Sequence, residues 1–116
     1  MSVRAPPISV IRALLQELIR FLTALSRLRV GPSIRISSWW RDPVTNRRVG
    51  GHPDSQHLLG LALDLVGEEL ELRQLLVDVR AVGLVAVMES THLHVQLLPA
   101  GVARAIGLFA RRSTFT

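Results

Sequence analysis

Three of the four histidines in this 116-residue chain lie in two short segments. Residues 55–64 read SQHLLGLALD, so Asp64 follows His57 by seven positions. Residues 92–95 read HLHV and hold His92 and His94. Imidazole nitrogen and carboxylate oxygen are ligands that zinc binds readily. The chain has no cysteine, so a zinc site here would use only histidine, aspartate or glutamate.

His57 and Asp64 can meet only if the chain turns between them, because an odd spacing puts two residues on opposite faces of a continuous strand. Gly60 permits such a turn, and we expect Asp64 to lie inside the strand that follows. A buried carboxylate is costly without a cation or hydrogen-bond donors. A metal ion would meet that need. Backbone donors or an arginine are the alternative, and the spacing alone does not decide between them.

His92 and His94 are expected on one side of a strand, since residues two apart share a face. Taken alone, this pair is slightly more typical of a solvent-facing strand than of a metal site. Two histidines together with Asp64 would leave a fourth tetrahedral position open, as in catalytic zinc sites. Such a site also needs a base that takes a proton from water, and Glu89 and the second histidine of the pair are the candidates.

Helical and strand patterns surround these segments. An apolar stripe predicts a helix over about residues 8–28, ended by Gly31-Pro32. Asp42-Pro43 predicts the start of a short helix that runs to Val49. Further elements are a helix over 68–82, a last helix in the tail after Pro99, and strands over 33–37, 61–66, 84–88 and 92–97. The sequence therefore predicts a small α+β domain, an antiparallel sheet with flanking helices.

Length and composition predict a single domain over residues 1–116, with 48% hydrophobic residues to form a core. The net charge is +5 and every basic residue is arginine, but the arginines are scattered, which favours a solvated surface over a nucleic-acid interface. Charged side chains interrupt the longest apolar region, residues 8–30, so neither a membrane span nor a signal peptide is predicted. We expect a monomer that is made in the cytoplasm.

Together these segments resemble a known family, the zinc D-alanyl-D-alanine carboxypeptidases and their endopeptidase relatives, which share a fold with the Hedgehog signalling domain. The family pattern is Ser-x-His, then Gly, Ala and Asp, and later His-Val in a strand. SSWWRDP (37–43) resembles its Ser-Gly-Tyr-Arg segment, and ESTHLHVQL (89–97) resembles a strand of phage and prophage members. The resemblance covers about residues 33–97, and the matching positions are Ser55, His57, Gly60, Ala62, Asp64, His94 and Val95.

The resemblance implies that His57, Asp64 and His94 bind one zinc ion. It also implies that Arg41 binds a carboxylate or carbonyl oxygen of the substrate, for which a planar guanidinium is well suited. Ser55 would form a hydrogen bond beside the metal or the substrate. Trp39-Trp40 departs from the family's Gly-Tyr, which predicts a different substrate pocket.

The resemblance further assigns Glu89 or His92 as the catalytic base or as the group that stabilises the oxyanion. Glu89 lies three residues before His92 and five before His94. The choice of the third ligand therefore stays open between the two histidines. His94 is favoured because Val95 follows it.

The implied activity is zinc-dependent hydrolysis of peptide bonds in bacterial peptidoglycan, by a D-Ala-D-Ala carboxypeptidase or an endopeptidase. The protein would act on the cell wall after release, or as part of a phage particle. The alternative is a catalytically inactive, zinc-binding relative that serves as a structural or wall-binding module.

Overall fold

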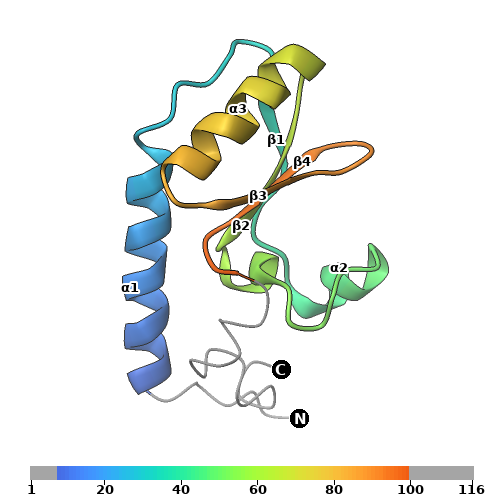
Figure 1. The fold of residues 1–116 in the computed structure, drawn as a ribbon. Coiled ribbons are helices and arrows are strands. Elements are labelled where there is room, and N and C mark those ends of the chain that lie inside the picture. Colours follow the sequence, from blue (N-terminus) through green and yellow to red (C-terminus); the bar gives the residue numbers. More distant parts are fainter. Residues whose placement is uncertain (1–7, 100–116) are drawn as a thin grey trace.

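Four strands and three α-helices make up most of residues 8–99, the part of the chain that the computed structural model describes (Figure 1). The tail helix expected after Pro99 lies outside these residues. No helix among them is long and apolar enough to cross a membrane. In chain order the elements are α1 (Ile8–Leu25), β1 (Arg35–Ser38), α2 (Pro43–Arg48), the short 3-10 helix η1 (Gln56–Leu59), β2 (Ala62–Val66), α3 (Glu69–Ala81), β3 (Val85–Met88) and β4 (Leu93–Gln96).

The strands form one antiparallel sheet in the order β1-β2-β4-β3. In the β2–β4 pair, Leu63 lies opposite Val95 and Asp64 lies opposite His94. Because side chains alternate along a strand, the apolar pair faces one side of the sheet and the polar pair the other. The predicted α+β fold with an antiparallel sheet is confirmed.

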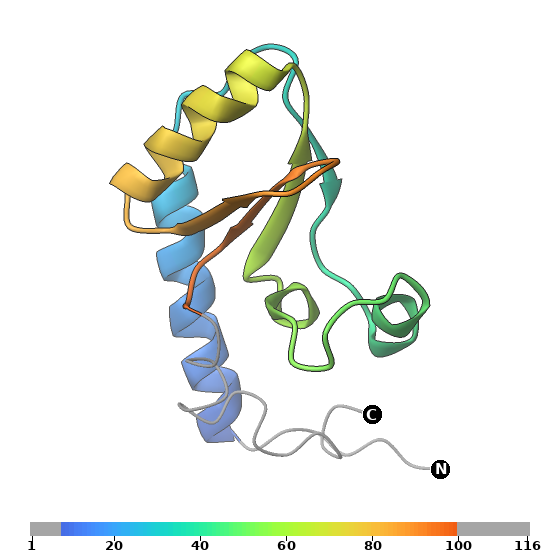
Figure 2. The ribbon, with the colours of Figure 1, turned by 45° about the vertical axis from the view of Figure 1, so that its right-hand side comes forward.

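The apolar side of the sheet packs against α1 and α3 (Figures 1 and 2). The apolar stripe of α1 buries Phe21 completely, and α3 contributes Leu72, Leu75 and Val79. Strands β2 and β4 supply most of the remaining core, with Leu63, Leu65, Leu93 and Val95. The helices thus bury one face of the sheet and leave the face that carries Asp64 free for another segment.

The segment that covers the polar face is the long connection from β1 to β2. It contains α2 and η1, and α2 lies on the side of the molecule away from α1 (Figure 2). Asp42 caps α2, since its Oδ1 accepts a hydrogen bond from Thr45 N at 2.8 Å, and Pro43 occupies the first turn, as the sequence predicted. The sequence prediction missed η1 and extended α1 three residues too far.

Strand β1 contains a bulge where it approaches the site. Ile36 pairs with Leu65 and Ser38 with Asp64, so Ser37 is an extra residue between the two pairs. The Ser37 hydroxyl donates to the Asp64 carbonyl at 3.2 Å. The bulge sets Ser38 opposite Asp64, where the connecting segment begins.

Phe21→Ala tests whether α1 is part of the core. Removal of a fully buried ring should lower the free energy of unfolding by about 3–5 kcal/mol. Urea unfolding followed by circular dichroism measures this change. Ile19→Ala on the same helix is the matched control, because Ile19 is 63% exposed and its loss should cost no more than about 0.5 kcal/mol. Equal losses in the two variants would contradict the packing of α1 on the sheet.

Candidate metal centre

His57 enters the site from η1, just before the chain turns into β2. Ser55 caps this short helix, and its Oγ accepts a hydrogen bond from His57 N at 3.2 Å. Gly60 ends the helix with φ of 71°, a left-handed conformation that glycine adopts without strain. The turn predicted at Gly60 is confirmed, and it brings His57 back over Asp64.

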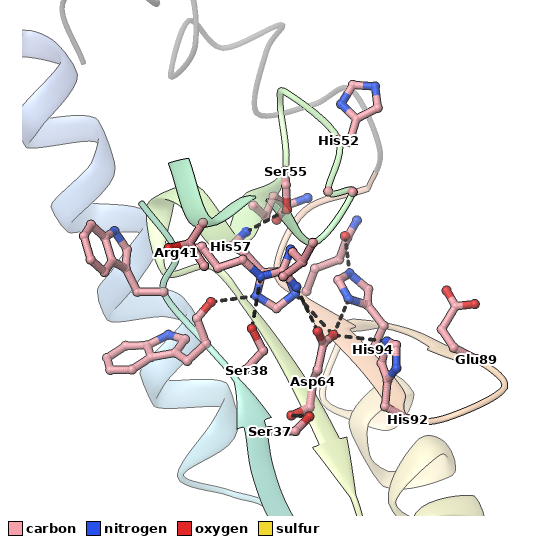
Figure 3. Close-up of a pocket in the computed structure, with 18 of the residues that line it drawn as sticks. Ser37, Ser38, Arg41, His52, Ser55, His57, Asp64, Glu89, His92 and His94 are labelled. Carbon is pink, nitrogen blue, oxygen red and sulfur yellow. Dashed lines mark hydrogen bonds and ion pairs between the residues drawn. The ribbon is translucent and has the colours of Figure 1, made fainter. Parts of the chain in front are cut away.

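Asp64 is the centre of the polar cluster, and its side chain is buried from solvent. Figure 3 shows three imidazoles pointing toward it. Its Oδ1 lies 2.9 Å from His94 Nδ1, 3.2 Å from His57 Nε2 and 3.5 Å from His92 Nε2. Its Oδ2 lies 3.0 Å from Arg41 Nη2. One carboxylate oxygen is therefore held by an arginine, and the other faces three histidines.

The electrostatics of the cluster favour a negative carboxylate with positive charge beside it. Burial alone would raise the pKa of Asp64, but the neighbouring His57 and His94 outweigh burial and hold this pKa well below its usual range. In return, the contact with Asp64 raises the pKa of His94 against the lowering effect of burial. The position between Oδ1 and the imidazoles is thus favourable for a cation.

His57 provides a direct test of whether a metal fits. Its Nδ1 lies 2.6 Å from the Trp39 carbonyl oxygen, which can only accept, so Nδ1 carries the hydrogen and neutral His57 has its lone pair on Nε2. This buried Nε2 forms no hydrogen bond within residues 8–99 and faces Asp64 Oδ1. Two lone pairs in contact repel each other, and either a metal ion or a proton between them removes the repulsion. Orientation of the ring by a backbone carbonyl is also typical of metal-binding histidines.

The residues brought together match the predicted ligand set. His57, Asp64 and His94 offer ligand atoms that all lie within 4.8 Å of one another, the only such group in the described part of the chain. Two nitrogens and one oxygen suit zinc and leave a coordination position open. His92 lies beside this group, and its side chain is partly exposed. Its Nδ1 lies 2.9 Å from Thr91 Oγ1. That His94 and not His92 is the third ligand stays a prediction.

Arg41 forms three hydrogen bonds to other side chains, which the sequence analysis did not predict. Its guanidinium donates to Ser38 Oγ at 3.1 Å, to Asn46 Oδ1 at 3.1 Å and to Asp64 Oδ2 at 3.0 Å. Within residues 8–99, three of its five N–H groups form hydrogen bonds, and the other two are left for a substrate oxygen. Its predicted contact with substrate stays a prediction, but the structure adds a second role, which is to hold Asp64.

Asn46 is a part of the site that the sequence analysis missed. It is 2% exposed, accepts from Arg41, and donates through Nδ2 to the His52 carbonyl at 2.8 Å. A Cβ on Gly51 would collide with its side-chain oxygen, so any other residue at that position would displace the Asn46 side chain. No local pattern in the sequence marks Asn46, because its role depends on folding of the loop.

The cluster lines one wall of an open pocket that also receives Ser55, Glu89, Gln96 and the Trp39-Trp40 pair. Glu89 lies on the turn between β3 and β4 with an exposed side chain, and its N–H donates to the His92 carbonyl at 2.8 Å. Figure 3 shows it beside His92 at the edge of the pocket. His52 is exposed and lies on the rim of the same pocket.

An open pocket with a possible metal-binding group at its base is typical of a hydrolytic enzyme, and comparison with known protein families agrees with this. A family model described as Peptidase M15 matches residues 2–96. The chain belongs to the Peptidase M15 family. Comparison with curated proteins and with solved structures gives no match. The predicted resemblance is thereby confirmed at the level of the family.

Peptidase M15 is a zinc-dependent family, and membership supports a metallopeptidase that acts on peptidoglycan in general. The donor set of His57, Asp64 and His94 agrees with that metal.

Metal content tests the site directly. We expect this M15 domain to bind about one zinc ion, and His57→Ala to bind it at least about tenfold more weakly, because a ligand and the partner of Asp64 are lost together. Elemental analysis after dialysis and competition with a coloured chelator measure the two quantities.

His52→Ala is the matched control, since His52 is an exposed histidine on the same rim. It should leave the zinc content unchanged. Equal zinc affinity of the His57→Ala variant and the wild type would contradict the site.

Proposed function

We propose that this protein is a zinc peptidase that hydrolyses peptide bonds in the stem peptides of bacterial peptidoglycan. The observation that carries the proposal is the buried Nε2 of His57, which forms no hydrogen bond within residues 8–99 and faces Asp64 Oδ1 at the base of an open pocket. This is a cation site to which a substrate has access. Membership of Peptidase M15 supports the same class of reaction.

His57, Asp64 and His94 would hold the zinc ion. When bound, zinc lowers the pKa of a water molecule and polarises a carbonyl oxygen, which is the chemistry that peptide hydrolysis needs. Arg41 holds Asp64 Oδ2, which keeps Oδ1 turned toward the histidines. The two unused N–H groups of Arg41 would donate to a carbonyl or carboxylate oxygen of the substrate.

Glu89 and His92 are the residues proposed to handle the proton and the developing negative charge. Both line the pocket. His92 Nε2 lies 3.5 Å from Asp64 Oδ1, so it reaches the atoms around the proposed metal position. A carboxylate at Glu89 would accept a proton from water, and an N–H at His92 would stabilise an oxyanion.

Ser55 supports the site indirectly, through the backbone of His57. Its hydroxyl caps η1 and so fixes the backbone of His57, while the side chain also lies on the pocket wall. We propose that it contributes to substrate binding from that wall. The pocket is open, which accommodates either a chain end, as a D-Ala-D-Ala carboxypeptidase requires, or a continuing peptide, as an endopeptidase requires.

Digestion of purified peptidoglycan tests the activity and identifies the bond. The zinc-loaded protein should release fragments that mass spectrometry can assign, a chelator should stop release, and added zinc should restore it. Release of free D-alanine indicates a carboxypeptidase, and larger fragments indicate an endopeptidase. Intact zinc binding without any released product would contradict the proposal and favour a catalytically inactive wall-binding relative.

Glu89→Gln and His92→Gln separate the catalytic roles from the metal site. Loss of the residue that acts as base should lower kcat by about 10²–10⁴-fold while the zinc content stays at the wild-type level. His52→Ala serves again as the control on the same rim. If both variants keep wild-type kcat, neither residue takes part in proton transfer.

A further inference from the structure

A chain of three polar groups lies behind His94 and extends to the segment that carries His57. His94 Nε2 lies 2.8 Å from Gln96 Oε1. Gln96 Nε2 lies 2.7 Å from the Leu98 carbonyl oxygen. Gln56 closes the chain with two hydrogen bonds to Leu98, one to its carbonyl at 2.7 Å and one from its N–H at 3.0 Å.

The direction of each hydrogen bond in this chain follows from one atom, the Leu98 carbonyl oxygen. A carbonyl only accepts, so the amide nitrogen of Gln96 must face Leu98 and its amide oxygen must face His94. That oxygen also only accepts, so His94 Nε2 must carry a hydrogen. Neutral His94 then has its lone pair on Nδ1, the nitrogen that lies 2.9 Å from Asp64 Oδ1.

The backbone of Leu98 is itself fixed from the opposite side of the site. Gln56 is 6% exposed, precedes His57 in η1, and holds both polar groups of Leu98. The Gln56 carbonyl in turn accepts from Leu61 N at 2.9 Å, where the chain enters β2. The segments that carry His57 and His94 are thus joined by side-chain amides that make directional hydrogen bonds.

We propose that Gln96 is a positioning residue that fixes the Nε2–H form of His94 and so presents Nδ1 to the metal. Gln56 supports this role, because it holds the Leu98 backbone whose carbonyl orients the Gln96 amide. The inference rests on the metal site of the proposed function. It specifies Nδ1 as the His94 atom that would bind the metal, and it explains why Nδ1 and not Nε2 faces the cluster. Gln96 touches neither substrate nor metal in this role.

Gln96→Met tests the proposal, because it keeps the length of the side chain and removes both hydrogen bonds. The Leu98 carbonyl keeps its bond from Gln56, so no buried acceptor is left without a donor. We expect zinc affinity about 10–100-fold weaker than in the wild type, as for other groups that orient metal ligands. We also expect long-range proton–nitrogen spectra of the zinc-bound protein, in which the metal replaces the proton on the coordinating nitrogen, to change from the Nε2–H form of His94 to a mixture of forms.

Gln74→Met is the matched control, an exposed glutamine on α3 that bonds to Asp78. It should leave zinc affinity and the His94 spectrum unchanged. Gln96→Glu is the second variant, because a carboxylate still accepts from Nε2–H and should keep the Nε2–H form. It also gives a result if the methionine variant fails to fold, since loss of the Nε2–H form in a folded Gln96→Glu protein would overturn the proposal.

The outcomes distinguish this inference from the proposed function. A Gln96→Met protein with wild-type zinc affinity and an unchanged Nε2–H signal overturns the role of Gln96 while the zinc peptidase stands. A wild type without zinc affinity overturns the metal site, and with it both the proposed function and this inference.

Discussion

The structure depends on a single buried carboxylate. Asp64 lies in a central strand, where an ionised group is costly unless it is compensated. Arg41 compensates one oxygen, and three imidazoles gather at the other. Three segments of the polar face meet at Asp64: the bulged strand β1, the long connection that carries Arg41 and His57, and the segment that carries His92 and His94. The same requirement creates the chemistry, because a negative oxygen surrounded by nitrogen lone pairs attracts a cation.

The hydrophobic core on the apolar side of the sheet offsets the free-energy cost of burying Asp64 in a small domain. Leu63 and Val95, next to Asp64 and His94 in their strands, point into the core formed with α1 and α3. Alternation along β2 and β4 therefore separates the two tasks of the sheet, since one face supplies hydrophobic stability and the other holds the polar cluster. Strands β2 and β4 carry Asp64 and His94, and strands hold side chains more precisely than the loops that complete the site.

Features encoded by local chemistry could be predicted from the sequence. Asp42-Pro43 caps a helix by itself, and Gly60 permits a left-handed turn by itself. The resemblance supplied the grouping of His57, Asp64 and His94. In contrast, the bonds from Arg41 to Asp64 and from Asn46 to Arg41 join residues from separate elements, and no spacing in the chain reveals them. Gln96 was missed for the same reason, because the orientation of its amide depends on a hydrogen bond to the Leu98 carbonyl.

The direct pairing of Asp64 with His94 has a consequence for how the sheet finds its alignment. A slip of β4 by one residue would set Leu93 or Val95 opposite Asp64 and turn His94 toward the hydrophobic core. The misaligned sheet would bury a carboxylate and an imidazole on opposite faces, each without its partner. Apolar side chains alone discriminate weakly between neighbouring alignments of short strands, whereas this polar pair rejects the wrong ones. Two of the residues proposed to bind zinc, Asp64 and His94, therefore also help to select the correct pairing of β2 and β4.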